Sequence, residues 1–386
     1  MKRALPMLLT ALALLSPLSA VTADGAMWNA TSVGDVGYLP LEDLRSFYKL
    51  LPLPQKESGT RAVGNGAVSL VFGPGARELR IHGVRCILSH PVRDEVTNKD
   101  LLLSKEDMVK LIDPVLRPTY IANRRLIKTI VLDPGHGGHD AGTVTPYARE
   151  ADITLTIATK LAEELKKRGH HVVLTHEANH YLSDQQRVDM ANNALNAAFI
   201  SLHLNSGRSD ICGAETYTMA PAAADARPLP GNEYDAANMA LGMALQSSLV
   251  QGCGAPDGGC RRARYSLLSS LNCPAALVEL GYATHAAEGA RLNTETYQTR
   301  IVQSLADGIE RFVTLMNPDT VLQASDVPAA ADEPAAPAPV EAGRSQPPAD
   351  PAKNTKNNNR RSSGKSTGSS KKSDVKSTGS TRRTRR

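Results

Sequence analysis

The stretch Ile130-Val131-Leu132-Asp133-Pro134-Gly135-His136-Gly137-Gly138 decides how this chain folds. Its first three residues are apolar and typical of a short buried strand, and the Pro-Gly pair that follows them ends that strand. The glycines on both sides of His136 let the backbone adopt positive φ and pass close to a bound group. A lone histidine beside glycine is usually only a loop residue, so His136 indicates a site only if it has partners elsewhere in the chain.

Strand and helix patterns alternate through residues 126–316. Apolar runs of strand length lie at residues 129–132, 172–174, 199–204, 215–219, 265–268 and 275–280. Helical patterns occupy residues 153–168, 183–193, 234–250 and 296–316. This alternation predicts an α/β fold in which a mostly parallel sheet is covered by helices on both faces. The functional crevice of such sheets lies outside the carboxyl ends of the strands, where we expect His136, His203 and Glu279.

Three further residues are candidates for the same site. Glu150 precedes a helical pattern, where an acidic residue can also simply stabilise the first turn. His203 shares its strand face with Ser201 and Asn205, and a hydrogen-bonded core histidine is the alternative. Glu279 lies inside an apolar strand, where a carboxylate without a partner is costly to bury. Two imidazoles and two carboxylates at such positions can converge on one zinc ion with a carboxylate to spare, which indicates a zinc hydrolase.

Four strings of this region carry a resemblance to a known family. They are residues 130–138, quoted above, and Arg149-Glu150-Ala151-Asp152-Ile153-Thr154-Leu155, Ser201-Leu202-His203-Leu204-Asn205-Ser206 and Leu277-Val278-Glu279-Leu280-Gly281-Tyr282. In order and content they resemble the zinc-dependent N-acetylmuramoyl-L-alanine amidases, over residues 126–316. The resemblance implies a Zn²⁺ cofactor whose ligands are His136, Glu150 and His203, with Glu279 as the catalytic carboxylate.

The implied reaction is hydrolysis of the amide bond between N-acetylmuramic acid and the L-Ala of peptidoglycan by a zinc-activated water. Asp133 or a backbone carbonyl is expected to orient a ligand imidazole. Two rival functions remain open. A pseudoenzyme could bind peptidoglycan without cutting it, although the intact ligand set and Glu279 argue against this. A zinc peptidase acting on stem peptides would use the same metal chemistry.

The N-terminus has the layout of a secretory signal peptide, which we place at residues 1–23. Lys2 and Arg3 precede an apolar stretch that is short for a membrane span, and small residues follow it. We therefore expect an exported protein, either periplasmic or secreted and associated with the cell wall. Five cysteines suit an oxidising compartment. Cys253 and Cys260 flank a Gly-rich turn and either close a small disulfide loop or remain thiols, as all five can.

Residues 31–120 predict a small α+β accessory domain. Apolar residues recur at helical spacing over residues 41–51, and short strand patterns follow at residues 68–72, 78–81 and 85–88. A second helix is expected to begin at Ser104, whose hydroxyl can cap it, with Asp107 three residues further on. A weak repeat aligns Leu39-Pro40-Leu41-Glu42-Asp43-Leu44 with Leu103-Ser104-Lys105-Glu106-Asp107-Met108. The arrangement resembles the stalk-like N-terminal domain first named from copper amine oxidases. This resemblance implies a spacer or docking module.

The composition changes again at residue 317. Residues 317–386 are first rich in Pro and Ala and then basic, with too few apolar residues to form a core, so we expect a disordered tail. Residues 351–386 carry a charge of +11, against −6 for the rest of the chain. Besides peptidoglycan, the expected partners are acidic envelope polymers or an anionic membrane surface. Nucleic acid is disfavoured because no aromatic residue interleaves these charges, and the oligomeric state stays open.

Overall fold

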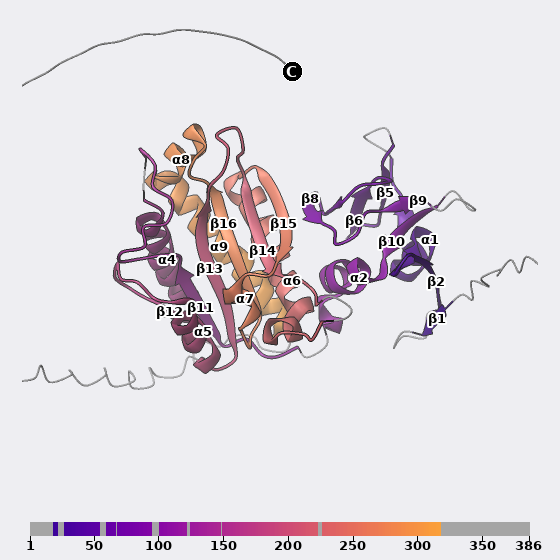
Figure 1. Ribbon diagram of the computed structural model, residues 1–386, viewed down its shortest axis with the longest axis horizontal. Helices are drawn as coiled ribbons and strands as arrows, with labels where there is room; N and C mark the ends of the chain where they lie inside the picture. Colours follow the sequence, from indigo (N-terminus) through magenta and orange to yellow (C-terminus); the bar gives the residue numbers. More distant parts are fainter. Residues whose placement is uncertain are drawn as a thin grey trace, which may run out of the picture. The chain divides into compact units, whose positions relative to one another are not determined.

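Figure 1 shows the computed structural model of the 386-residue chain. The structure describes residues 18–21, 27–54, 59–66, 68–94, 100–121, 124–147, 149–222 and 226–317. These residues belong to one compact unit, Met1–Ala329. The tail predicted from residue 317 lies outside the described residues apart from Asn317, and the predicted signal peptide lies outside them apart from Leu18–Val21. Within the described part, no helix has the length and apolar character needed to cross a membrane.

The amidase-like region is built on a mixed sheet. In spatial order its strands are β12 (His171–Leu174), β11 (Thr129–Pro134), β13 (Ala197–Asn205), β16 (Ala275–Tyr282), β14 (Ala214–Met219) and β15 (Asp257–Ala263). The first four strands run parallel, β14 is antiparallel to β16, and β15 is parallel to β14. The α/β fold with a mostly parallel sheet is therefore confirmed, and the carboxyl ends of β11, β13 and β16 meet at one edge.

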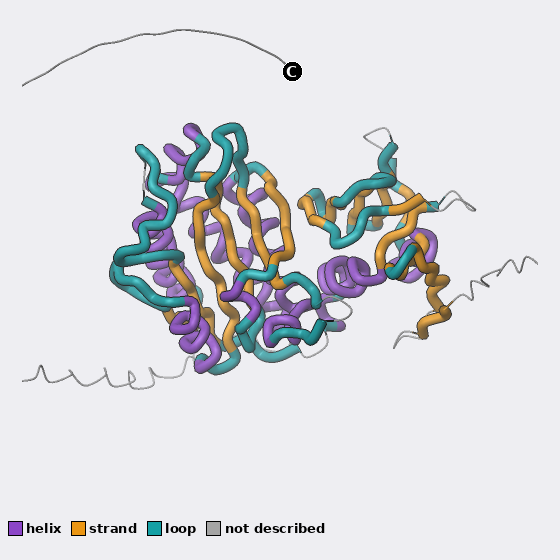
Figure 2. Tube along the Cα trace, viewed as in Figure 1, coloured by secondary structure: helices purple, strands orange, loops and turns teal. Residues whose placement is uncertain are grey.

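Helices cover both faces of this sheet (Figures 1 and 2). One side carries α4 (Glu150–Lys167), α6 (Asp235–Ser248), η4 (Leu249–Cys253) and α9 (Glu295–Met316), and the other carries α5 (Asp184–Asn193) and α7 (Ser266–Ser269). Short connections form η3 (Pro230–Tyr234) and α8 (Ala286–Leu292).

Side-chain alternation along the strands explains the two layers. Ile130 and Leu132 join the core with α4 and α9, while Val131 between them joins the core with α5 and α7. The same alternation places Ile200 in the first core and Phe199 in the second. A fully buried central strand therefore has apolar residues on both sides, as a sheet with two helical layers requires.

One part of the sequence prediction is wrong. Residues 265–268 form no strand but overlap the short helix α7. The last three residues of the Gly-rich segment 254–259, which we took for a turn, begin strand β15. This strand gives no apolar pattern because glycines occupy two of its positions. Glycine is needed there because the neighbouring strand lies close: a Cβ at Gly258 would lie 2.5 Å from Cγ of Glu215. Cys253 and Cys260 are free and buried, so the loop-closing disulfide is not formed.

The N-terminal region contributes two sets of strands. A separate sheet contains β1 (Leu18–Val21), β2 (Met27–Val33), β3 (Val36–Pro40), β10 (Leu101–Ser104) and β9 (Arg93–Asp94). A second set comprises β8 (Val84–Ile87), β7 (Glu78–Ile81), β6 (Ser69–Phe72), β5 (Arg61–Gly64) and β4 (Leu51–Pro52). The helical elements of the N-terminal region are α1 (Leu41–Tyr48), α2 (Lys105–Asp107), η1 (Met108–Ile112), α3 (Asp113–Leu116) and η2 (Pro118–Tyr120).

The capping predicted at Ser104 is confirmed, since its hydroxyl accepts a hydrogen bond from the Asp107 backbone N–H. A single residue pair, Cys86 with Cys260, joins β8 to β15, so the two regions share one sheet. Asp107 also forms a buried ion pair with Arg262 of β15. The limits of the accessory domain stay a prediction.

Candidate metal centre

The four candidate residues lie at one edge of the sheet. His136 follows β11, Glu150 is the first residue of α4, His203 is near the end of β13, and Glu279 is within β16. Because β13 and β16 pair in parallel register, His203 and Glu279 are direct neighbours across the strands. Residues far apart in the sequence are thus brought together by strand order.

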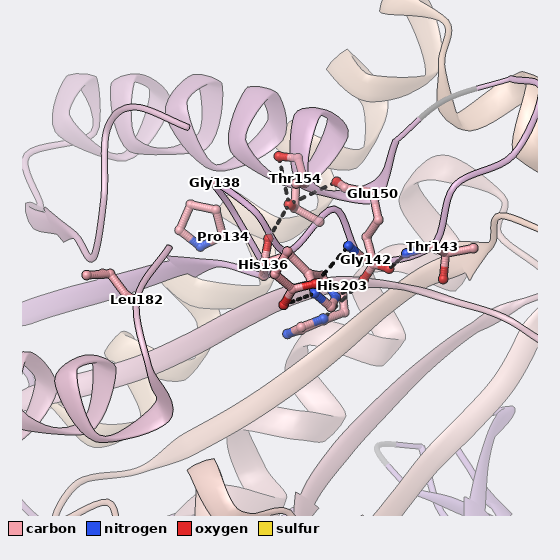
Figure 3. A network of polar contacts seen from close by, with 12 residues as sticks. Pro134, His136, Gly138, Gly142, Thr143, Glu150, Thr154, Leu182 and His203 are labelled. Carbon is pink, nitrogen blue, oxygen red and sulfur yellow. Dashed lines mark hydrogen bonds and ion pairs between the residues drawn. The ribbon is translucent and has the colours of Figure 1, made fainter. Parts of the chain in front are cut away.

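The side chains of His136, Glu150 and His203 point toward one another (Figure 3). Oε1 of Glu150 lies 3.0 Å from Nε2 of His136 and 3.1 Å from Nδ1 of His203. One ligand atom from each residue lies within 4.8 Å of the other two. The structure therefore brings together all three residues proposed as metal ligands.

Backbone donors fix the Glu150 carboxylate between the two imidazoles. Its Oε2 accepts a hydrogen bond of 2.8 Å from the Thr143 N–H, and its Oε1 accepts one of 2.9 Å from the Leu204 N–H. Burial raises the pKa of Glu150, but hydrogen bonds from His136 and His203 outweigh burial and hold that pKa well below its usual range. Glu150 is therefore a buried, ionised group, which favours a positive charge beside it.

Glycines make this close packing possible. A Cβ at Gly135 would lie 2.4 Å from Cε1 of His203, and a Cβ at Gly142 would lie 2.6 Å from Oε2 of Glu150. Gly142 also has a φ of +62°, and His136 itself has a φ of 66°, which is rare for a residue with a side chain. The sequence Gly135-His136-Gly137 thus serves the site through its backbone as well as through the imidazole.

The residue that orients His136 is not the expected one. Oδ2 of Asp140 lies 2.8 Å from Nδ1 of His136, the ring nitrogen that faces away from Glu150. Burial lowers the pKa of His136, but Glu150 and Asp140 together raise it to about 9. Asp133, which we expected in this role as the alternative to a backbone carbonyl, instead accepts hydrogen bonds from Arg187, Thr175 and Ser201.

Glu279 differs from Glu150 because it forms no ion pair with any residue that the structure describes. Its Oε2 is buried and has no hydrogen-bond partner. Burial raises the pKa of Glu279 to about 7, and the negative charges of Glu150 and Glu215 add to that rise while His203 and His136 oppose it. It lines an open pocket of about 310 Å³ together with His136, Glu150 and His203.

The donor set fits a zinc ion. Two imidazole nitrogens and one carboxylate oxygen are the ligands of catalytic zinc sites that keep one position open. The pocket leaves that position accessible, and the unpartnered carboxylate of Glu279 faces the same space. The hydrogen bond to Asp140 is the carboxylate–histidine contact that usually supports a zinc ligand.

Residues 130–311 match the family described as N-acetylmuramoyl-L-alanine amidase. This part of the chain belongs to that family. The amidase domain is 29% identical over 186 residues to the uncharacterized protein YqiI of Bacillus subtilis (strain 168), covering 48% of this chain and 84% of that protein. It is 30% identical over 183 residues to the N-acetylmuramoyl-L-alanine amidase LytC of the same organism, covering 47% of this chain and 34% of LytC.

Among solved structures, the amidase domain is 32% identical to the catalytic domain of CwlV, an N-acetylmuramoyl-L-alanine amidase from Bacillus (Paenibacillus) polymyxa var. colistinus. That comparison covers 49% of this chain and 99% of the CwlV domain, with a TM-score of 0.43. Because the match spans only about a third of LytC, the activity and partners of the present protein as a whole are proposals rather than consequences of that likeness.

Glu215 is a further buried carboxylate of the amidase domain, and it was not recognised from the sequence. It lies opposite Glu279 on the neighbouring strand β14. Its oxygens contact the guanidinium of Arg261 at 2.8 Å, the Tyr217 hydroxyl at 2.7 Å and the Tyr282 hydroxyl at 3.2 Å. A charged residue within an apolar strand was the available signal, the same one that identified Glu279.

Proposed function

We propose that this protein hydrolyses the amide bond between N-acetylmuramic acid and L-Ala in peptidoglycan. The observation that carries the proposal is the placement of Glu150 Oε1 within 3.1 Å of both imidazoles, beside the unpartnered carboxylate of Glu279. The membership of residues 130–311 in the amidase family supports this identification of the bond that is cut. The arrangement combines a place for a Lewis acid with a carboxyl group free to move a proton.

His136, Glu150 and His203 would hold a zinc ion through the nitrogen and oxygen atoms that face one another. Bound zinc would supply a Lewis acid that activates water and polarises the amide carbonyl. The chain keeps the ligands in place before the ion arrives: the N–H groups of Thr143 and Leu204 fix the carboxylate of Glu150, and Asp140 fixes the ring of His136. Such fixed ligands reduce the cost of organising the site.

Glu279 would act first as a general base and then as a general acid. As a base, it would accept a proton from the attacking water, and as an acid it would deliver that proton to the departing nitrogen of L-Ala. Without a metal, burial raises the pKa of Glu279 to about 7, and a bound zinc ion would lower that pKa and favour the ionised form that accepts a proton from water. Glu279 lines the pocket in which that water would lie, together with the three proposed ligands.

We also propose roles for the rest of the chain. Residues 1–23 would direct export, so that the enzyme meets the cell wall, and the accessory domain would serve as a stalk-like spacer or docking module. The basic end of residues 317–386 would hold the enzyme to acidic envelope polymers or an anionic membrane surface. Removing residues 317–386 should then weaken retention on such surfaces and reduce its dependence on salt. Unchanged retention would remove this role.

Digestion of purified peptidoglycan, followed by mass spectrometry of the soluble products, tests the proposed reaction. The protein should release stem peptides that begin with a free L-Ala amino group. Glu279→Gln should lose about 100-fold or more in rate, because a general base is removed while the proposed ligands remain. Fragments cut within the stem would make the protein a peptidase, and an uncut substrate would leave only binding.

A further inference from the structure

Arg187 makes contacts that the proposed function does not yet use. It lies on α5, and its side chain is only 5% exposed. Its guanidinium donates hydrogen bonds to Oδ1 of Asp133 at 2.6 Å, to the Pro134 carbonyl at 2.7 Å and to the His136 carbonyl at 2.8 Å. Its Nε donates a weaker one, at 3.2 Å, to the Leu182 carbonyl. Figure 3 includes the labelled ends of this network at Pro134, His136 and Leu182.

Two of these acceptors connect Arg187 to the backbone of residues 134–138, the loop that carries His136 and that we call the ligand loop. His136 has a φ of 66°, a conformation that a residue with a side chain adopts only when its surroundings hold it. The guanidinium fixes the carbonyl oxygen of that same residue and of Pro134, two residues before it. The direction of the His136 ring toward Glu150 therefore depends on a backbone geometry to which Arg187 is bonded.

Arg187 is itself held in place from both sides. A capping box between Ser183 and Gln186 fixes the first turn of α5, from which Arg187 projects. Asp133, which is fully buried, also accepts hydrogen bonds of 2.7 Å from Thr175 and from Ser201. Ser201 lies two residues before His203 on β13, so the same network reaches the strand of the second proposed histidine ligand.

We propose that Arg187 is a positioning residue of the metal centre, acting on His136 through the backbone. The inference rests on the proposed function, because it assumes that His136 is a zinc ligand. The planar guanidinium can bond several acceptors at fixed angles, whereas a lysine ammonium supplies charge without that fork. Arg187→Lys should therefore keep a cation beside Asp133 but loosen the His136 carbonyl. We expect zinc affinity to fall by about 10- to 100-fold, the usual loss when a residue that supports a ligand is changed.

The test measures zinc affinity of the full chain by competition with a chromophoric chelator. The wild-type protein is compared with Arg187→Lys and with a control, Arg168→Lys. Arg168 also makes several ion pairs, to Glu164, Asp307 and Glu310, but it follows the C-terminal end of α4, the end opposite the proposed ligand Glu150. The visible absorption spectrum of the cobalt-substituted proteins adds a readout of ligand geometry. We expect weaker zinc binding and an altered cobalt spectrum for Arg187→Lys, and neither change for Arg168→Lys.

A charge-neutral double variant separates positioning from stability. Asp133→Asn combined with Arg187→Met removes both buried charges, so no charge is left unpaired in the interior. If Arg187 positions His136, zinc binding stays weak in this variant even when its thermal unfolding midpoint is close to that of the wild type. Wild-type zinc affinity in Arg187→Lys or in the double variant would overturn the inference and leave the proposed function intact. Absence of zinc binding by the wild-type protein would overturn both.

Discussion

Replacing Glu279 by glutamine is expected to stabilise the zinc-free protein by an amount that grows with pH. Oε2 of this carboxyl is buried without a hydrogen-bond partner, and burial raises the pKa of the group from 4.5 to about 7. One pKa unit corresponds to about 1.4 kcal/mol, so this rise corresponds to about 3 kcal/mol between the two protonation states. The glutamine side chain has a similar shape and never ionises.

The sign follows from the direction of the pKa change. A carboxyl whose pKa is raised by folding favours the folded state while it is protonated, below the ordinary value of 4.5. That contribution is lost as the pH rises through about 7, because ionisation then occurs more easily in the unfolded chain. The free energy of unfolding of Glu279→Gln, relative to wild type, should therefore increase by about 2 kcal/mol between about pH 5 and about pH 8.

Chemical denaturation of both zinc-free proteins at these two pH values measures the difference. Repeating the comparison with zinc provides the control. A bound cation beside the carboxyl favours its ionised form, so zinc should reduce the difference in free energy of unfolding between the two proteins. A difference between the two proteins that stays constant from acid to alkaline pH would refute the reasoning. It would mean that the unpartnered carboxylate costs the fold nothing when ionised.

Other predictions concern the proposed zinc ligands. Gly142→Ala should sharply weaken zinc binding in a competition titration, since the new Cβ would lie 2.6 Å from Oε2 of Glu150 at a φ of +62°; unchanged binding would show that the loop can shift freely. Asp140→Asn should weaken zinc binding by about 10-fold, because the contact that supports His136 loses its charge. A chelator should abolish peptidoglycan hydrolysis, and added zinc should restore it; activity that survives chelation would exclude the metal from the reaction.

Much of the fold could be predicted because the pattern of polar and apolar residues along a strand indicates which side chains are buried. The alternation around His203 indicated which residues face the core, and the structure places Ile200, Leu202 and Leu204 together in it. Strand β15 was missed because its glycines carry no apolar signal, and their purpose is visible only when Glu215 lies against Gly258. The sequence of one strand does not show how much space the side chains of the neighbouring strand need.

The sequence pointed to the proposed ligands, which the structure brings together, but not to the residues that contact them. His136, Glu150 and His203 stood out because charged and imidazole side chains occupied strand ends and a helix start. The sequence suggested Asp133 or a backbone carbonyl as the group that orients a ligand imidazole, and it did not suggest Asp140, which contacts His136 beside a left-handed backbone turn. Arg187 reaches the His136 backbone from α5, which is separated from it in the sequence by α4 and β12, so only the tertiary structure reveals the contact.

Hydrolysis of peptidoglycan in oxygen-18-labelled water tests the central claim most directly. Cleavage of the amide between N-acetylmuramic acid and L-Ala places the labelled oxygen on the lactyl carboxylate of the sugar, where fragment masses locate it. We predict label at that carboxylate, and none in the released stem peptides, with the wild-type protein. Label in a carboxyl group of the peptide instead would contradict the account, because the bond cut would then lie within the stem.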